Sequence, residues 1–99
     1  MKYRKKPIVI EAFQMTPERR ADNADWPQWL HQAWNKPWEE AGSVCCADYP
    51  NSKGTDKLQI KTLEGVMTVE WNDWIILGVK GELYPCKPDI FAATYEAVA

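Results

Sequence analysis

The residues best suited to chemistry gather near the C-terminal end of the chain. Residues 80–87 include two lysines, a glutamate, a tyrosine and a cysteine. Cys86 is the best candidate nucleophile, because the neighbouring Lys87 could stabilise a thiolate. We favour the alternative, in which Cys86 is a small buried side chain at the end of a strand.

Other residue types used in catalysis or metal binding form no recognisable pattern. His31 is the only histidine, and we expect it to be exposed on a helix. Cys45 and Cys46 are adjacent, Cys86 is distant, and zinc needs about four ligands at suitable spacing. No phosphate-binding loop or nucleophile motif occurs. The sequence therefore predicts three free thiols, no metal, no cofactor and no catalytic residues, and we expect that the protein is not an enzyme.

The remaining polar side chains of this region are candidates for binding. We predict that they are at least partly exposed, near one rim of a sheet and beside an aromatic side chain. The polar residues are Lys80, Glu82, Tyr84 and Lys87, and the aromatic neighbour is Trp71; the five together are the candidate binding residues.

A hairpin accounts for three further residues of the same region. Asp73 begins a strand that Lys80 ends, so the two lie about 20 Å apart at the rise of a strand. We expect Asp73 to accept a hydrogen bond from a nearby backbone amide. Gly78 indicates a bulge or the close approach of another backbone, and Gly81 is expected to have a positive φ in a two-residue turn.

The elements that must position these residues follow from hydrophobic periodicity. A strand is predicted over 7–14, one helical turn or a loop after residue 16, and a helix over 26–34 that Pro37 ends. Residues 39–56 are irregular apart from a short strand within 44–49. A β-meander follows, and a final helix begins at residue 88, with apolar residues on one face. The strands of the meander are predicted over 58–62, 67–71, 74–79 and 82–86.

Burial follows from the same patterns. The tryptophan-rich helix is expected to pack Trp29, Leu30 and Ala33 onto the sheet, with Trp26 and Trp34 on either side. Residues 74–79 are almost continuously apolar, which is typical of a central strand covered on both faces. We therefore expect Trp74, Ile76 and Phe91 to be buried. The predicted fold is α+β: an antiparallel meander sheet, which can curl into a small open barrel, with an inserted tryptophan-rich helix and a C-terminal helix.

Bulk composition limits the classes of function. The 99 residues are 45% hydrophobic and 26% charged, with a net charge of -2, which indicates one globular domain over 1–99. No apolar run is long enough for a membrane span, and the N-terminus lacks the apolar region of a signal peptide, so we expect a cytoplasmic protein. A basic stretch opens the chain, and we interpret it as a solvated arm or edge rather than a phosphate-binding patch, so nucleic acid is not an expected partner. Its charges are Lys2, Arg4, Lys5 and Lys6.

Two blocks of the chain resemble a family of small phage and prophage proteins. They are MKYRKKPIVIEAFQ at the start and TLEGVMTVEWNDWIILGVKGELYPCKPDIFAATYEAV at the end. Asn72 stands where glycine is usual in that family. The resemblance implies a bacterial cytoplasmic setting and carries over no catalytic residue.

Two hypotheses of function follow. The first is a phage accessory protein that binds a host or phage protein, because six tryptophans in so short a chain indicate aromatic contact sites. The second is a small-molecule binder, for example one that sequesters a nucleotide signal. Self-association is left open.

Overall fold

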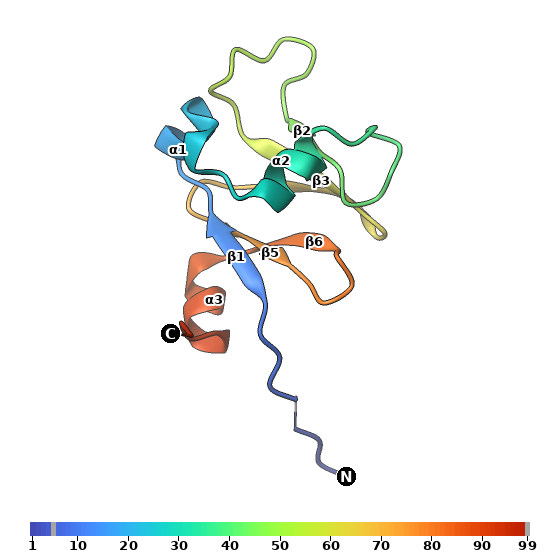
Figure 1. Ribbon diagram of the computed structural model, residues 1–99, viewed down its shortest axis with the longest axis vertical. Coiled ribbons are helices and arrows are strands. Elements are labelled where there is room, and N and C mark those ends of the chain that lie inside the picture. Colours follow the sequence, from blue (N-terminus) through green and yellow to red (C-terminus); the bar gives the residue numbers. More distant parts are fainter. Residues whose placement is uncertain (5, 99) are drawn as a thin grey trace.

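The computed structural model describes residues 1–4 and 6–98 (Figure 1); Lys5 of the basic stretch lies outside the described residues. The fold is α+β, as predicted, with the tryptophan-rich helix inserted between the first two strands and a helix near the C-terminus. In chain order the elements are β1 (Glu11–Gln14), α1 (Pro17–Ala21), the 3-10 helix η1 (Asn23–Asp25), α2 (Gln28–Trp34), β2 (Val44–Cys46), β3 (Leu58–Thr62), β4 (Gly65–Val69), β5 (Trp74–Leu77), β6 (Leu83–Cys86) and α3 (Pro88–Thr94).

The expected single meander is divided between two antiparallel sheets. One sheet has the order β1-β5-β6 and the other β2-β3-β4, and neither closes into a barrel. The division occurs at residues 70–73, where Asn72 has φ 73° and the Met15 N–H donates to the Asp73 carbonyl at 2.9 Å. The backbone of this corner is therefore bonded to the end of β1, and it carries the chain from one sheet into the other instead of forming a hairpin.

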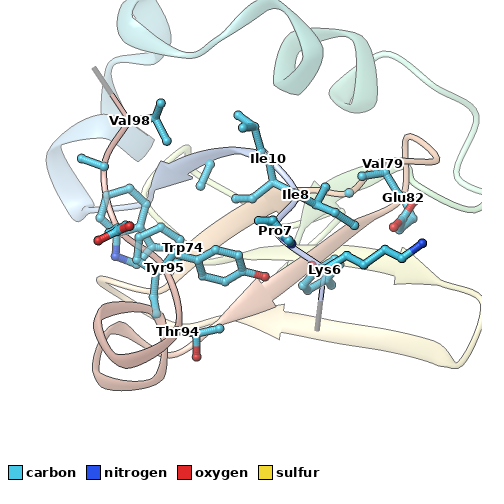
Figure 2. A pocket seen from close by; sticks show the side chains of 17 residues that line it. Lys6, Pro7, Ile8, Ile10, Trp74, Val79, Glu82, Thr94, Tyr95 and Val98 are labelled. Atoms are coloured by element: carbon cyan, nitrogen blue, oxygen red, sulfur yellow. The ribbon is translucent and has the colours of Figure 1, made fainter. Parts of the chain in front are cut away.

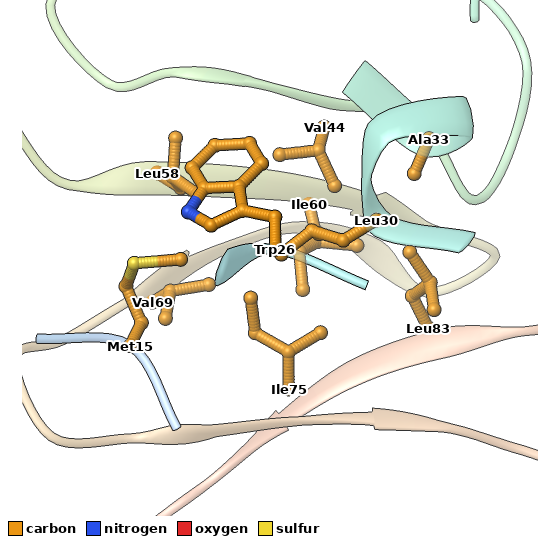
Figure 3. Packing of buried hydrophobic residues seen from close by; sticks show 10 residues of the cluster. All are labelled: Met15, Trp26, Leu30, Ala33, Val44, Leu58, Ile60, Val69, Ile75 and Leu83. Carbon is orange, nitrogen blue, oxygen red and sulfur yellow. The ribbon is translucent and has the colours of Figure 1, made fainter. Parts of the chain in front are cut away.

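The hydrophobic core lies between the two sheets and beneath α2 (Figure 3). Leu30 and Ala33 are buried, as predicted, but the buried tryptophan is Trp26, which is only 5% exposed. Trp29 is partly buried, so its predicted central place was wrong. Trp26 precedes the helix, and its indole N–H donates to the Arg19 carbonyl at 2.7 Å, which holds the ring inward. The core residues are Met15, Trp26, Leu30, Ala33, Val44, Leu58, Ile60, Val69, Ile75 and Leu83.

The first strand is shorter than predicted. Only residues 11–14 pair with β5, because β5 ends at Leu77, the partner of Glu11, and the chain then turns. The preceding residues have no strand partner among the described residues. They continue as an arm that projects away from both sheets (Figure 1, blue).

The C-terminal helix covers the sheet less completely than expected. Ile76 is buried, as predicted, but Trp74 and Phe91 are only partly buried. Their rings stack at 4.2 Å with an angle of 8°. The helix ends at Thr94, so Val98 lies beyond it and is exposed. One short helix cannot cover the whole outer face of β1-β5-β6, and that face stays partly open.

A buried arginine anchors the irregular segment that follows β2. Arg20 is 8% exposed, and its guanidinium lies 3.1 Å from an Asp56 carboxylate oxygen. Its Nε also donates to the Asp56 carbonyl at 2.9 Å, and the carboxylate accepts the Asp48 N–H at 2.8 Å. The expected strand within 44–49 is β2, which covers only the first half of that range. Arg20 thus holds residues 47–57 against α1 without regular structure.

Candidate functional site

A groove of about 850 Å³ lies over the outer face of the β1-β5-β6 sheet (Figure 2). Residues 6–10 of the arm form one wall, and α3 with the residues after it forms another. Figure 2 shows Val98 and Glu82 at opposite ends of the groove. The segments that build it are therefore the two ends of the chain and the β5–β6 hairpin.

Three aromatic rings run across this surface in a row. Trp74 stacks on Phe91, and Phe91 lies 5.1 Å from Tyr95 at an angle of 31°. All three residues line the groove and are partly exposed. Stacked rings offer a large, rigid apolar surface with little conformational freedom to lose on binding.

Tyr84 supplies a polar group next to these rings. Burial is the main cause that raises the pKa of Tyr84 to about 12, and a hydrogen bond with the Tyr95 side chain adds to it, followed by the charge interactions with Tyr95, Glu82 and Cys86. The hydroxyl is therefore uncharged at neutral pH and can both donate and accept hydrogen bonds.

Glu82 folds back over the hairpin loop. Its carboxylate accepts the Lys80 backbone N–H at 2.9 Å, and a Cβ placed on Gly78 would collide with it. The group that approaches Gly78 is thus a side chain, not the backbone or bulge that we expected. Gly81 has φ 81°, as predicted, but the loop has three residues: the Gly78 N–H donates to the Glu82 carbonyl at 2.8 Å. A three-residue loop needs its left-handed residue at the last position.

The five candidate binding residues are at least partly exposed, but they do not form one rim. Glu82 and Tyr84 line the groove, whereas Lys80 contributes a backbone bond to Glu82. Trp71 packs against the hydrophobic core instead. The β5–β6 register pairs Trp74 with Cys86, which places Lys87 at the opposite end of the hairpin from Lys80.

Lys87 has a structural partner at that end. Its Nζ lies 3.3 Å from Oδ2 of Asp73, whose side chain is only 3% exposed. The same Oδ2 accepts the Glu70 N–H at 3.0 Å, so the predicted backbone contact of Asp73 is confirmed. Asp73 and Lys87 therefore stabilise the corner between β4 and β5.

The cysteines show no sign of activation. Burial, followed by the negative charges of Asp73 and Asp89, raises the pKa of the Cys86 thiol, so the activation by Lys87 that we considered and did not favour does not occur. Cys86 is partly buried at the end of β6. Burial also raises the pKa of the Cys45 thiol, with further contributions from Cys46 and Asp56. Thiols held in their protonated form are poor nucleophiles.

His31 also has the surroundings of a structural side chain. His31 is partly buried rather than exposed, and its ring lies 5.6 Å from the Trp26 ring. The described residues contain no group of three or more histidine, cysteine, aspartate or glutamate side chains that could hold a metal ion. Within the same residues, no helix is long and apolar enough to cross a membrane.

Sequence reasoning missed most of the groove. It identified Glu82 and Tyr84, but not the arm residues 6–10 or the C-terminal residues 94–98 that form the walls. The one available signal was the apolar run of residues 8–10, which we assigned to a paired strand.

No match was found when the chain was compared with known protein families, with curated proteins and with solved structures. The groove and its chemistry therefore carry the functional argument.

Proposed function

We propose that this chain is a non-enzymatic binding module that holds an apolar segment of a protein partner in its groove. The observation that carries the proposal is the lining of the groove. Three of its 17 residues are charged: Lys6, Glu82 and Glu96. Most of the others are apolar or aromatic, and buried aromatic anchors dominate many protein interfaces.

The openness of the groove favours a protein segment over an enclosed ligand. Ile8 is 52% exposed, Val9 is 75% exposed and Val98 is 71% exposed, although all three line the groove. Apolar side chains that converge on one surface and stay in contact with water indicate an interaction site. An extended partner segment would cover both walls at once.

The setting of the proposed partner follows from the sequence. The N-terminal and C-terminal blocks that resemble phage and prophage proteins include residues of both walls and of the floor. We therefore propose that the partner is a host or phage protein in the bacterial cytoplasm, and that this chain is a phage accessory protein.

A small-molecule ligand is the second candidate. A volume of about 850 Å³ lies within the range of about 300–1,000 Å³ that is typical of small-molecule sites. A planar ring could lie against the aromatic row, within reach of the Tyr84 hydroxyl. A ligand of this kind would use the floor of the groove more than its exposed walls.

One experiment separates the two candidates. The protein is purified gently from a bacterial lysate and measured by native mass spectrometry, first as wild type and then as Val98→Asp and Thr94→Asp. Both substitutions place a charge in the groove at exposed positions, so the fold should be retained. Ile90→Asp is the matched control, because Ile90 is an exposed apolar residue of α3 that does not line the groove.

We expect a co-purifying protein that is lost from both groove variants and retained by Ile90→Asp. A small molecule at one equivalent would favour the second candidate instead. A partner that binds the groove variants and the control equally well would contradict the assignment of the groove.

A further inference from the structure

The edge strand β4 is apolar, exposed and unprotected. Among the described residues it pairs only with β3, and its consecutive residues Val66 and Met67, on opposite faces of the strand, are 52% and 42% exposed. Edge strands are normally protected from further pairing by lysine, proline, a bulge or a very short length. β4 has the sequence Gly-Val-Met-Thr-Val over five residues and has none of these features.

The other edges of the two sheets are better protected. β2 has only three residues, β6 contains Pro85, which lacks a backbone donor, and β1 has four residues, of which the first is the exposed, charged Glu11. β4 is therefore the edge at which another strand would add most readily. Its unpaired main-chain groups and its exposed apolar side chains are the features that strand addition uses.

The N-terminal arm has the complementary features. Its residues 8–10, Ile-Val-Ile, are of the type favoured in strands, yet they pair with no strand of the described chain. The first six residues hold four of the 12 basic residues and none of the 14 acidic ones, so the rest of the chain has 14 acidic and eight basic residues. A basic arm and an acidic body attract each other.

We infer that a second copy of this chain covers β4 with its N-terminal arm. In an antiparallel register with Val9 opposite Met67, Lys6 lies opposite Glu70, which is ion-paired with Lys57 but is still 44% exposed. Pairing β4 with β4 of another copy, with Met67 opposite Met67, would instead bring Glu64 opposite Glu70, which is unfavourable. Charge therefore favours the arm as the occupant.

In the single chain the arm lies elsewhere: residues 6–10 line the groove over the outer face of β1-β5-β6, beside α3. β4 belongs to the other sheet, and the arm has no strand partner among the described residues. Pairing of the arm with β4 is therefore a contact with a second copy, and reciprocal exchange of two arms gives a closed two-fold dimer.

Sedimentation velocity of the purified protein over a range of concentrations tests the inference without any partner, so it is independent of the proposed function. We expect a monomer–dimer equilibrium that Met67→Lys and Val9→Lys each weaken at least tenfold. Both positions are exposed in the single chain, so the variants should fold. Ile90→Lys, at an exposed apolar position outside arm and edge, should dimerise like wild type.

Cross-linking identifies the two contacting segments. In a background with all three cysteines replaced by serine, a Val9→Cys chain is mixed with a Met67→Cys chain and oxidised. We expect the mixed disulfide to exceed both self-pairs. A protein that is monomeric at every concentration, a dimer insensitive to Val9→Lys, or preferential pairing of two Met67→Cys chains would each overturn the inference.

Discussion

Replacement of Trp26 by alanine should be among the most destabilising single changes in the core. Trp26 is 5% exposed, and its indole N–H donates to the Arg19 carbonyl at 2.7 Å. Truncating a large core aromatic costs about 3–5 kcal/mol, through lost transfer free energy and the cavity that remains. A domain of this size has a total stability of about 5–15 kcal/mol, so Trp26→Ala should lower the free energy of unfolding by a large fraction.

Trp29→Ala is the matched comparison. Trp29 lies on α2, three residues after Trp26, but is only partly buried against the core, so its truncation should cost about 1–2 kcal/mol. Urea denaturation followed by far-ultraviolet circular dichroism gives the free energy of unfolding of both variants. Trp26→Phe removes the indole hydrogen bond but keeps an aromatic ring in the core, so it separates the contribution of the hydrogen bond from that of packing. If Trp29→Ala costs as much as Trp26→Ala, the assignment of Trp26 as the buried ring of the core is refuted.

Three further predictions concern ionisable groups. Burial and hydrogen bonding raise the pKa of Tyr84 to about 12. The contribution of the neutral Tyr84 hydroxyl to the free energy of unfolding should therefore be complete below pH 10 and be lost as the pH rises toward 12. Tyr84→Phe should remove this loss of stability at high pH. Burial acts to raise the pKa of Asp56, but hydrogen bonds from Ser52 and from backbone amides, together with the charge of Arg20, lower it overall. The free energy of unfolding should therefore fall as the pH drops below about 4, and it should fall less in Asp56→Asn. Replacing all three cysteines by serine should keep the circular dichroism spectrum, with a modest loss of stability.

Each of these three predictions has a direct check. Ultraviolet absorbance during a base titration should show one tyrosine that ionises late in wild type and is absent from Tyr84→Phe; identical curves would contradict the assignment. Equal acid-induced losses of stability in wild type and Asp56→Asn would remove the role of that carboxylate. A triple variant that is unfolded in buffer, or a wild-type protein that retains one equivalent of zinc, would contradict a passive role for the thiols.

Local features of the fold were predictable because they depend on neighbouring residues. The helical period of Leu30 and Ala33 placed both in the core, and the alternation of residues 58–62 identified β3. Gly81 was predicted to have positive φ, although the loop proved to have three residues. These features follow from side-chain period and turn chemistry, which act over a few residues.

The division into two sheets was not predictable in the same way. It depends on contacts of Met15 with the corner at Asn72 and Asp73, more than 50 residues away in sequence. The groove depends likewise on the meeting of residues 6–10 with residues 94–98. The predicted rim failed because four polar residues and Trp71 were assigned to one place, whereas the hairpin register separates Lys80 from Lys87 by the length of β5.

Residues 6–10 connect the two proposals, because they form a wall of the groove in the single chain and the pairing strand in the inferred dimer. An arm that pairs with β4 of a second copy is removed from its own groove, which then loses the contacts of Ile8 and Ile10. By linkage the two effects are reciprocal. Self-association weakens partner binding by some factor, and a bound partner weakens self-association by that same factor.

If both proposals hold, the Met67→Lys chain has an edge that no longer accepts an arm. It should then bind the groove partner more tightly than wild type at concentrations where wild type dimerises. Equal affinities at such concentrations would show that the arm does not contribute to holding the partner.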